Sequence, residues 1–272
     1  MKVIRGKKAL ITGAASGIGR SIALALADEG AALFLLDIDA EKLAAVVTEA
    51  RSRGAEATGR PCDVGEPRQI DESIAAVIKA WGDLDILINN AGIAYYGDTG
   101  KMTDAQWDRL LAVNLHAPIF FIRRLLPLLL ARPEAHILNV CSIFGLVPKR
   151  RMAAYQTTKY ALAGLSQSLR YEYSPRGLGV TTLCPGLVDT NLLAAARERN
   201  WLARGFDPPA FMYISPDVIA ARAIHAIRRN KGLVVLTAHA RLLWILYRLS
   251  PHMLDAWQHF KDKRKAAARA AI

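Results

Sequence analysis

Short apolar runs alternate with amphipathic segments along most of this 272-residue chain. Seven runs predict strands, at residues 8–12, 32–37, 56–62, 84–89, 136–141, 179–184 and 232–237. Six segments have the apolar spacing of helices, at residues 17–29, 40–53, 67–81, 104–131, 152–174 and 216–229. Most of the strands are apolar throughout, as parallel strands with both faces buried usually are. We therefore predict an α/β fold with a doubly wound, seven-stranded parallel sheet and helices on both faces.

One domain is predicted over residues 1–237, because no linker or change of composition divides them. Residues 238–272 are predicted to form a basic, amphipathic helical extension. The net charge of the chain is +12, and the part from Arg222 to the C-terminus holds 11 Lys/Arg against 2 Asp/Glu. This uneven distribution indicates a local property of the C-terminus. It does not favour nucleic-acid binding, so no nucleic-acid partner is expected.

The extension has one apolar stripe at helical spacing, formed by Leu242, Leu246, Leu249, Met253, Trp257 and Phe260. Pro251 interrupts the stripe, so two helical pieces are expected. Basic side chains such as Arg241, Arg248 and Lys261 lie beside it. Three roles are compatible with this pattern: packing on the same or a neighbouring subunit, closing over an apolar pocket as a lid, and peripheral binding to an anionic membrane.

The sequence TGAASGIG (12–19) joins the first predicted strand to the first helix. Gly13, Gly17 and Gly19, with Ser16 and Ile18 between them, would let phosphate oxygens approach the backbone. The free N–H groups at the start of the helix would then face a pyrophosphate. A glycine-rich turn of this kind also occurs as an ordinary tight connection, so the context has to decide between the two interpretations.

Asp37 closes the second predicted strand, where a carboxylate can accept hydrogen bonds from the hydroxyls of an adenosine ribose. The same carboxylate would repel the 2′-phosphate of NADP, and Ile38 offers no cation to hold one. These two residues favour NAD over NADP as the cofactor. The alternative for Asp37 is a helix N-cap.

Polar residues also end the third and fourth predicted strands. In a doubly wound sheet the carboxyl ends of the strands meet at one edge, where ligands bind. Asp63 and Val64 in CDV (62–64) would lie near the adenine, and Asn90, Ala91 and Gly92 in NNAG (89–92) near the middle of the cofactor. Taken singly, each of these residues is equally compatible with capping a loop.

Eight motifs occur in order: TGAASGIG (12–19), Asp37, CDV (62–64), NNAG (89–92), Asn114 in VNL, Ser142 in NVCSIFG, Tyr155 with Lys159 in YQTTK, and CPGLVDT (184–190). Together they closely resemble the short-chain dehydrogenase/reductase family in its single-domain form, over about residues 5–237. The resemblance implies a Rossmann-type sheet and an NAD-dependent oxidoreductase that interconverts a secondary alcohol and a ketone. A reductase of 3-oxoacyl thioesters is the alternative enzyme, and a non-catalytic dinucleotide sensor is the alternative outside catalysis.

Tyr155 and Lys159 lie four residues apart, on one face of a predicted helix. A phenol with a pKa of about 10 is a poor base near neutrality, but a neighbouring ammonium favours the phenolate. The resemblance implies that Tyr155 is the general acid/base, that Lys159 lowers its pKa and holds the nicotinamide ribose, and that Ser142 binds the substrate oxygen. By the same analogy, Asn114 holds a water in a proton relay. The resemblance also implies residues that line the nicotinamide, namely Pro185, Gly186, Val188 and Thr190.

The substrate pocket is expected from the loops that follow NNAG, Ser142 and Pro185. The predicted pocket residues are Ala94, Tyr95, Phe144, Val147, Leu187 and Leu192, and the substrate loop spans about residues 187–215. They are apolar or aromatic, which suits a lipophilic or aromatic substrate. Alternatively, several of them only pack against the loop. The basic residues 149–151 either form part of the solvated surface or attract the anionic tail of a substrate, such as the phosphates of a CoA thioester.

Three scattered cysteines, Cys62, Cys141 and Cys184, form no metal-binding pattern, so no metal site is predicted. They are typical of reduced thiols in a cytosolic protein. Neither a signal peptide nor a membrane-spanning run is predicted. The chain is therefore expected in the cytoplasm, with a peripheral membrane contact through its extension left open. Family analogy indicates a homotetramer or a homodimer.

Overall fold

A seven-stranded parallel sheet organises the fold in the computed structural model, which describes residues 1–188, 192, 198, 201 and 213–252. Its strands are β1 Lys8–Thr12, β2 Ala32–Asp37, β3 Ala57–Pro61, β4 Ile86–Asn89, β5 Ala135–Val140, β6 Leu178–Cys184 and β9 Leu233–Val235. They pair in the order β3-β2-β1-β4-β5-β6-β9, and every pair is parallel. The predicted doubly wound sheet of seven strands is confirmed.

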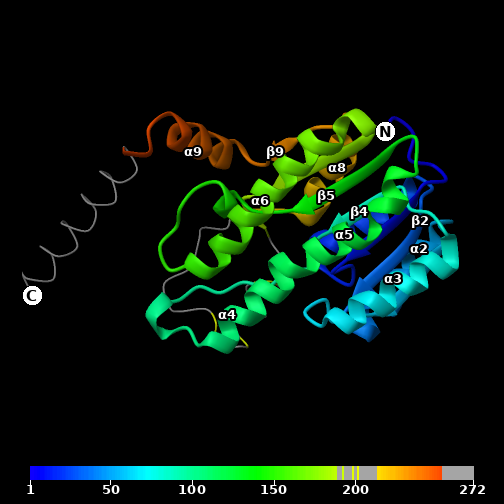
Figure 1. The fold of residues 1–272 in the computed structure, drawn as a ribbon, viewed down its shortest axis with the longest axis horizontal. Coiled ribbons are helices and arrows are strands. Elements are labelled where there is room, and N and C mark those ends of the chain that lie inside the picture. Colours follow the sequence, from blue (N-terminus) through cyan, green and yellow to red (C-terminus); the bar gives the residue numbers. More distant parts are fainter. Residues whose placement is uncertain (189–191, 193–197, 199–200, 202–212, 253–272) are drawn as a thin grey trace, which may run out of the picture.

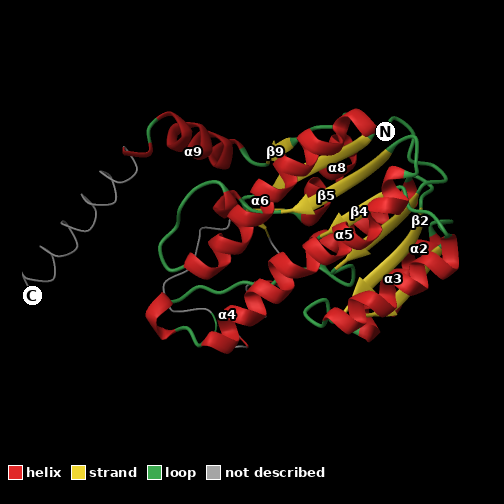
Figure 2. Cartoon of the chain, viewed as in Figure 1, coloured by secondary structure: helices red, strands yellow, loops and turns green. Residues whose placement is uncertain are grey.

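Helices cover both faces of this sheet (Figures 1 and 2). They are α1 Gly17–Asp28, α2 Ala40–Ser52, α3 Pro67–Trp81, α4 Asp104–Leu111, α5 Ala117–Leu130, α6 Ala153–Tyr173, α8 Pro216–Arg228 and α9 Ala238–Leu249. One core joins α1, α2 and α8 to the sheet, and a second core joins α3, α5 and α6 to the other face. Alternate strand residues enter the two cores: Leu33 and Leu35 of β2 belong to the first, Phe34 and Leu36 to the second.

The segment predicted as one helix over 104–131 contains a π-turn at Ala112–His116 between α4 and α5. The N–H of Ala117 donates to the carbonyl of Ala112, five residues back. Pro118, at the start of α5, has no N–H for the carbonyl four residues before it, which breaks the regular α-helical pattern here. This interruption was not predicted, and it lies at Asn114.

The combined stretch Asp104–Leu130 is long and apolar enough to cross a membrane, judged among the described residues alone. However, 44% of its most apolar window is buried inside the fold. Phe121, Leu125 and Leu129 of α5 belong to the core that this helix shares with α3 and the sheet. Packing within the domain accounts for the buried part of this apolar stretch.

A short parallel pair, β7 Leu187–Val188 and β8 Tyr213–Ile214, was not predicted. It holds together the two ends of the predicted substrate loop, with Leu187 opposite Tyr213 and Val188 opposite Ile214. Most residues between these strands lie outside the described part of the chain, as do Met253, Trp257 and Phe260 of the C-terminal stripe.

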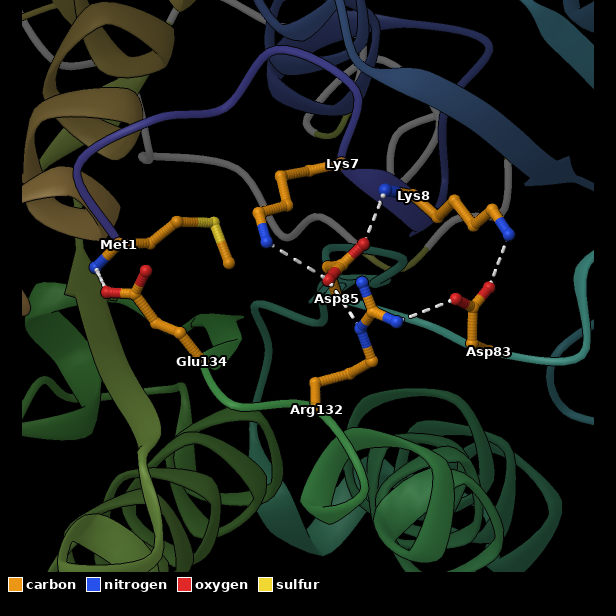
Figure 3. A network of polar contacts seen from close by, with 7 residues as sticks. All are labelled: Met1, Lys7, Lys8, Asp83, Asp85, Arg132 and Glu134. Carbon is orange, nitrogen blue, oxygen red and sulfur yellow. Dashed lines mark hydrogen bonds and ion pairs between the residues drawn. The ribbon is translucent and has the colours of Figure 1, made fainter.

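A polar network ties together the starts of three strands, at the edge of the sheet opposite their carboxyl ends (Figure 3). Asp85 is buried and accepts hydrogen bonds from the backbone N–H of Lys8 at 3.0 Å and from Arg132 Nε at 2.9 Å. Arg132 also binds Asp83 at 2.9 Å. Further pairs join Lys7 to Asp85, Lys8 to Asp83, and the N-terminal amine of Met1 to Glu134. The network positions β1, β4 and β5 relative to one another.

His136 on β5 is fully buried, and burial lowers its pKa to about 3. The Thr181 hydroxyl donates to the carbonyl of Lys231 at 2.6 Å, so this hydroxyl accepts from His136 Nε2, 2.8 Å away. The ring is therefore a neutral imidazole with its proton on Nε2.

This histidine makes the fold sensitive to acid. The pKa of about 3 in the folded chain lies below the value of about 6.5 in the unfolded chain, so its stabilising contribution is complete above pH 6.5 and is lost as the pH falls toward 3. At pH 5 the free energy of unfolding should be about 2 kcal/mol lower than at pH 7 on account of this one group. Urea unfolding of wild type, His136→Gln and the exposed-site control His225→Gln would measure it. The His225→Gln protein should keep this loss and the His136→Gln protein should not; equal losses in both would contradict the assignment.

Candidate active site

A cavity of about 400 Å³ opens at the carboxyl ends of the strands. It extends from Asp37 at the end of β2 to Leu192 in the substrate loop, and passes Asn90 after β4. Its walls contain most residues singled out from the sequence, namely Gly13, Ser16, Gly17, Ile18, Asp37, Ile38, Asp63, Val64, Asn90, Ala91, Gly92, Ser142, Tyr155, Lys159, Pro185, Gly186 and Val188. Seven separate stretches of sequence thus meet at one edge of the sheet, as doubly wound topology requires.

The glycine-rich turn lies against the loop that follows β4. A Cβ on Gly13, where φ is 65°, would lie 2.7 Å from the Cα of Ala91. A Cβ on Gly19 would lie 1.9 Å from the carbonyl oxygen of Gly13, so this glycine allows α1 to pack closely on the turn. Gly19 is not among the residues that line the cavity, so its contact with a cofactor stays a prediction.

The N-terminus of α1 faces the cavity without a side-chain cap. Ser16 is the N-cap residue, but its side chain makes no capping hydrogen bond, and the first turn contains no acidic residue. The backbone N–H groups of this turn are therefore available to an anionic ligand. This arrangement fits the pyrophosphate of a dinucleotide.

Asp37 is held in place by the backbone of the glycine-rich turn. Its Oδ2 accepts from the N–H of Ala15 at 2.9 Å, and its Oδ1 accepts from the N–H of Asp39 at 3.0 Å. The helix N-cap at this point is Asp39, which accepts from the N–H of Lys42, so the capping alternative for Asp37 is wrong. Ile38 beside it is 60% exposed. The carboxylate is oriented toward the end of the cavity where an adenosine ribose would bind.

Two polar side chains connect the loop after β4 to the end of β1. The Thr12 hydroxyl accepts from the N–H groups of Asn90 and Ala91, at 3.0 and 3.1 Å. The Asn90 amide donates to the carbonyls of Thr12 and Gly13, at 3.0 and 2.9 Å. These hydrogen bonds hold the loop after β4 against the end of β1. Asn90 therefore positions the backbone of this part of the cavity, and it also lines the cavity itself.

Arg109 of α4 is a cavity residue that sequence analysis missed. Its Nη2 lies 2.8 Å from both carboxylate oxygens of Asp63. The N–H of Gly65 donates to the same carboxylate at 2.8 Å, and a Cβ on Gly65 would lie 2.0 Å from Arg109 Nη1. Asp63 is thus paired and oriented at the adenosine end. No local signal marks Arg109, because its partner is 46 residues away in the sequence.

Tyr155 and Lys159 project from one face of α6 into the cavity, beside Ser142 at the end of β5. The ammonium nitrogen of Lys159 lies 5.8 Å from the centre of the Tyr155 ring and donates to the carbonyl of Val140 at 3.0 Å. The side chains of Tyr155, Lys159 and Ser142 are each at most 6% exposed. A phenol, an ammonium and a hydroxyl therefore share one water-poor corner.

Burial shifts the two titrating groups of this corner in opposite ways. It raises the pKa of Tyr155 above its ordinary value, and a hydrogen bond with the Ser142 side chain opposes the rise. Burial lowers the pKa of Lys159, and negative charge on Cys141 or Cys184 would oppose that change. Burial is the largest influence on the Tyr155 phenol in the protein alone, so the lowering of its pKa by Lys159 that the family resemblance implies stays a prediction for the protein with its cofactor bound.

Asn114 lies in the π-turn and is fully buried outside the cavity wall. Its side chain binds both backbone groups of Ile93, accepting from the N–H and donating to the carbonyl, each at 2.9 Å. It also donates to the Thr158 hydroxyl at 3.3 Å. A Cβ on Gly92 would lie 3.4 Å from Asn114 Oδ1 and 3.7 Å from Lys159 Nζ, so the two side chains flank the same glycine.

The predicted substrate pocket is only partly matched. Ala94, Phe144, Leu187 and Leu192 line the cavity, together with Ile93 and Met152, which were not predicted. Tyr95 instead packs edge-on against Trp201, and its hydroxyl donates to the carbonyl of Asp98. Val147 packs in an apolar cluster with Ala163 and Cys184 and is not among the residues that line the cavity. Tyr95 and Val147 do not line the cavity, so their place in the substrate pocket stays a prediction, and Thr190 lies outside the described residues.

Comparison with known proteins gives a family match over most of the chain. The sequence model for short chain dehydrogenases matches residues 7–201. The granaticin polyketide synthase putative ketoacyl reductase 1 of Streptomyces violaceoruber is 36% identical over 192 residues, which cover 70% of this chain and 71% of that protein. The putative oxidoreductase SadH of Mycobacterium tuberculosis is 31% identical over 256 residues, 92% of each chain.

Solved structures share the fold over almost the full length. A short chain dehydrogenase/reductase from Burkholderia phymatum in complex with NAD has a TM-score of 0.82 at 26% identity, and the match covers 93% of this chain and 97% of that one. A variant of the actinorhodin polyketide ketoreductase with NADPH has a TM-score of 0.79 at 29% identity, covering 88% and 99%. Neighbours of this fold thus bind either NAD or NADPH, which supports a nicotinamide dinucleotide cofactor here.

Proposed function

We propose, from the premise that this chain belongs to the short-chain dehydrogenase family, that it is an oxidoreductase which interconverts a secondary alcohol and a ketone with NAD. The observation that carries the proposal is the corner in which Tyr155, Lys159 and Ser142 meet inside one cavity with Asp37 at its far end. The rival interpretation, a non-catalytic dinucleotide sensor, is disfavoured because this set of polar side chains is complete.

In this proposal Tyr155 moves the proton. Its phenol would donate to the carbonyl oxygen during reduction and accept the hydroxyl proton during oxidation. Ser142, which already hydrogen-bonds Tyr155, would bind the same substrate oxygen and orient it. A bound nicotinamide dinucleotide would supply or accept the hydride, and its oxidised ring would add a positive charge near the phenol. Lys159 supplies the second positive charge, 5.8 Å from the Tyr155 ring centre.

Asn114 is proposed as a positioning residue for this proton transfer. Because it clamps both backbone groups of Ile93, it fixes the loop that carries Gly92 past Lys159. The water relay that the family resemblance implies would occupy the space beside Gly92, between the Asn114 amide and the Lys159 ammonium. Asn114 lies within the π-turn, a type of interruption that is frequent at functional sites.

We propose NAD as the preferred cofactor on the evidence of Asp37. Its two hydrogen bonds to backbone N–H groups hold the carboxylate at the adenosine end, where it would accept from both ribose hydroxyls of NAD. NADP would bring a 2′-phosphate against this negative charge. Lys42 also lines the cavity, but its ammonium is paired with Asp39.

The substrate is proposed to be a lipophilic or aromatic alcohol or ketone. Ile93, Phe144, Met152 and Leu192 give the substrate end of the cavity an apolar wall. A 3-oxoacyl thioester is the second candidate, since relatives named as ketoacyl reductases are similar in sequence and structure. The exposed basic run 149–151 offers positive charge for the phosphates of such a thioester.

A substrate screen tests the proposal directly. Purified protein would be assayed with secondary alcohols and ketones of increasing apolar size, and with 3-oxoacyl thioesters, in the presence of NAD⁺/NADH and NADP⁺/NADPH. We expect turnover with the lipophilic series and a higher kcat/KM with NAD(H), read from the absorbance of the reduced cofactor. Turnover of acyl thioesters alone would establish the second candidate instead, and bound cofactor without any turnover would favour a sensor.

Assembly and location follow from the same family assignment. We propose a homotetramer or homodimer, for which α6 offers an exposed side of small residues, Thr157, Ala161, Gly164 and Ser168. We propose a cytoplasmic location, which agrees with three cysteines that are free and buried.

A further inference from the structure

Helix α9 attaches to the domain through one face. Ala240, Leu243, Trp244 and Tyr247 pack in a cluster with Phe144 and Leu146. The Thr237 hydroxyl caps the helix by accepting from the N–H of Ala240, and Tyr247 hydrogen-bonds Tyr160 of α6. Figure 1 shows α9 at the edge of the fold, beyond β9. Ala240, Leu243, Trp244 and Tyr247 thus form the inner face of α9, the face that contacts the domain.

The opposite face of α9 is also apolar, and it is exposed. The exposed fractions are 58% for Leu242, 42% for Ile245, 40% for Leu246 and 79% for Leu249. At 100° per residue these four side chains fall within one quarter to one third of the helix circumference, opposite Tyr247 and Ala240. The predicted stripe of Leu242, Leu246 and Leu249 therefore points away from the domain. A helix that is apolar on both sides is normally buried on both sides, so this outer face needs a partner.

Positive charge borders the outer face. Arg241 and Arg248 are exposed along one edge of it, and α9 contains no Asp or Glu. The residues from 238 to 272 hold 7 Lys/Arg and 2 Asp/Glu, so the chain that follows the helix continues the same sign. A partner that covers the leucines and carries negative charge beside them would match both features.

From this combination we propose that the outer face of α9 docks on an anionic lipid surface. Aliphatic side chains flanked by arginines are the composition of helices that lie in the membrane interface, where acyl chains cover the apolar face and phosphates pair with the cations. A second copy of the chain fits less well. Two α9 helices packed together would bring their arginines to one contact with no carboxylate from either helix.

The docked position would bring the lipid close to the substrate end of the cavity. Phe144 lines the cavity and also packs in the cluster that holds the inner face of α9. A Cβ on Gly186, which lines the same cavity, would lie 3.1 Å from the Thr237 hydroxyl at the start of the helix. An apolar substrate dissolved in the membrane would then have a short path to the site.

Vesicle flotation of the full-length protein tests this proposal without reference to activity. The probes are vesicles of phosphatidylcholine with phosphatidylglycerol, and vesicles of phosphatidylcholine alone. We expect wild type to float with the anionic vesicles, less so at high salt, and Ile245→Gln combined with Leu249→Gln to lower binding by about tenfold or more. Ile78→Gln on α3 is the matched control, because Ile78 is 45% exposed and Ile245 42%.

The arginines have their own control. The double variant Arg241→Gln/Arg248→Gln should bind anionic vesicles more weakly than wild type. The control is the double variant Arg222→Gln/Arg229→Gln, on and after α8, which removes the same charge from another exposed surface. This control should bind as wild type does. Wild type that stays unbound overturns the proposal, and so does equal loss from both arginine pairs. A third result would also overturn the proposal: wild type does not bind vesicles but forms an oligomer, and the Ile245→Gln/Leu249→Gln variant dissociates that oligomer. This result would assign the outer face of α9 to a second copy of the chain.

Discussion

Tyr155→Phe is expected to lower kcat by about 10³-fold while the affinity for NADH changes little. The substitution removes the hydroxyl that would exchange a proton with the substrate oxygen, but keeps the ring that packs with Ala94 and Met152. Lys159 keeps its bond to the carbonyl of Val140, so the wall near the cofactor should stay intact. The loss should therefore appear in the chemical step rather than in binding.

Steady-state kinetics with the best substrate of the screen, and titration of NADH fluorescence, would measure the two quantities separately. Tyr160→Phe is the matched control, since Tyr160 lies on the same helix, is 40% exposed and is outside the cavity wall. It should keep wild-type kcat. A Tyr155→Phe protein that retains most of its turnover would refute the proposed proton transfer, whereas loss of NADH binding would show that the tyrosine mainly shapes the site.

Asp37→Ser combined with Ile38→Arg is expected to reverse the cofactor preference. The pair removes the carboxylate that would face a 2′-phosphate and adds a guanidinium at a position that is 60% exposed, where it can reach that phosphate. We expect the ratio of kcat/KM for NADP to that for NAD to rise by about 10²- to 10³-fold, since each factor of ten corresponds to about 1.4 kcal/mol.

The single variant Asp37→Asn separates charge from hydrogen bonding at this position. It keeps an oxygen that can accept from Ala15, and so should preserve the glycine-rich turn while the repulsion disappears. Its preference for NAD should fall by an intermediate factor. Both cofactors are measured on each variant because a loosened turn would weaken them together, and an unchanged ratio in the double variant would contradict the role of Asp37.

Much of this molecule was predictable from local pattern. All six predicted helical segments and seven strands occur, with ends shifted by up to two residues, because apolar periodicity reports which faces are buried. The YQTTK spacing likewise placed Tyr155 and Lys159 on one face of α6. Most cofactor-site predictions line one cavity for a topological reason: parallel strands end at the same edge.

Other features depend on neighbours that are distant in the sequence. The partner of Arg109 comes from the loop after β3, and Val147 packs with Ala163 of α6 and Cys184 of β6. The raised pKa of Tyr155 comes from burial by surrounding elements, and no pair of residues read locally reveals it. In each case the deciding neighbour comes from another element of the fold.

The C-terminal helix shows both sides of this division. The sequence by itself predicted a basic, amphipathic helical extension over residues 238–272 that Pro251 interrupts, and α9 is the part of it that the structure describes as a helix. Only the tertiary structure decided which face is free. Leu243, Trp244 and Tyr247 pack in the cluster that contains Phe144 and Leu146, so the leucine stripe points outward. A helical pattern specifies the angles between side chains, whereas their burial depends on the surface that the rest of the fold presents.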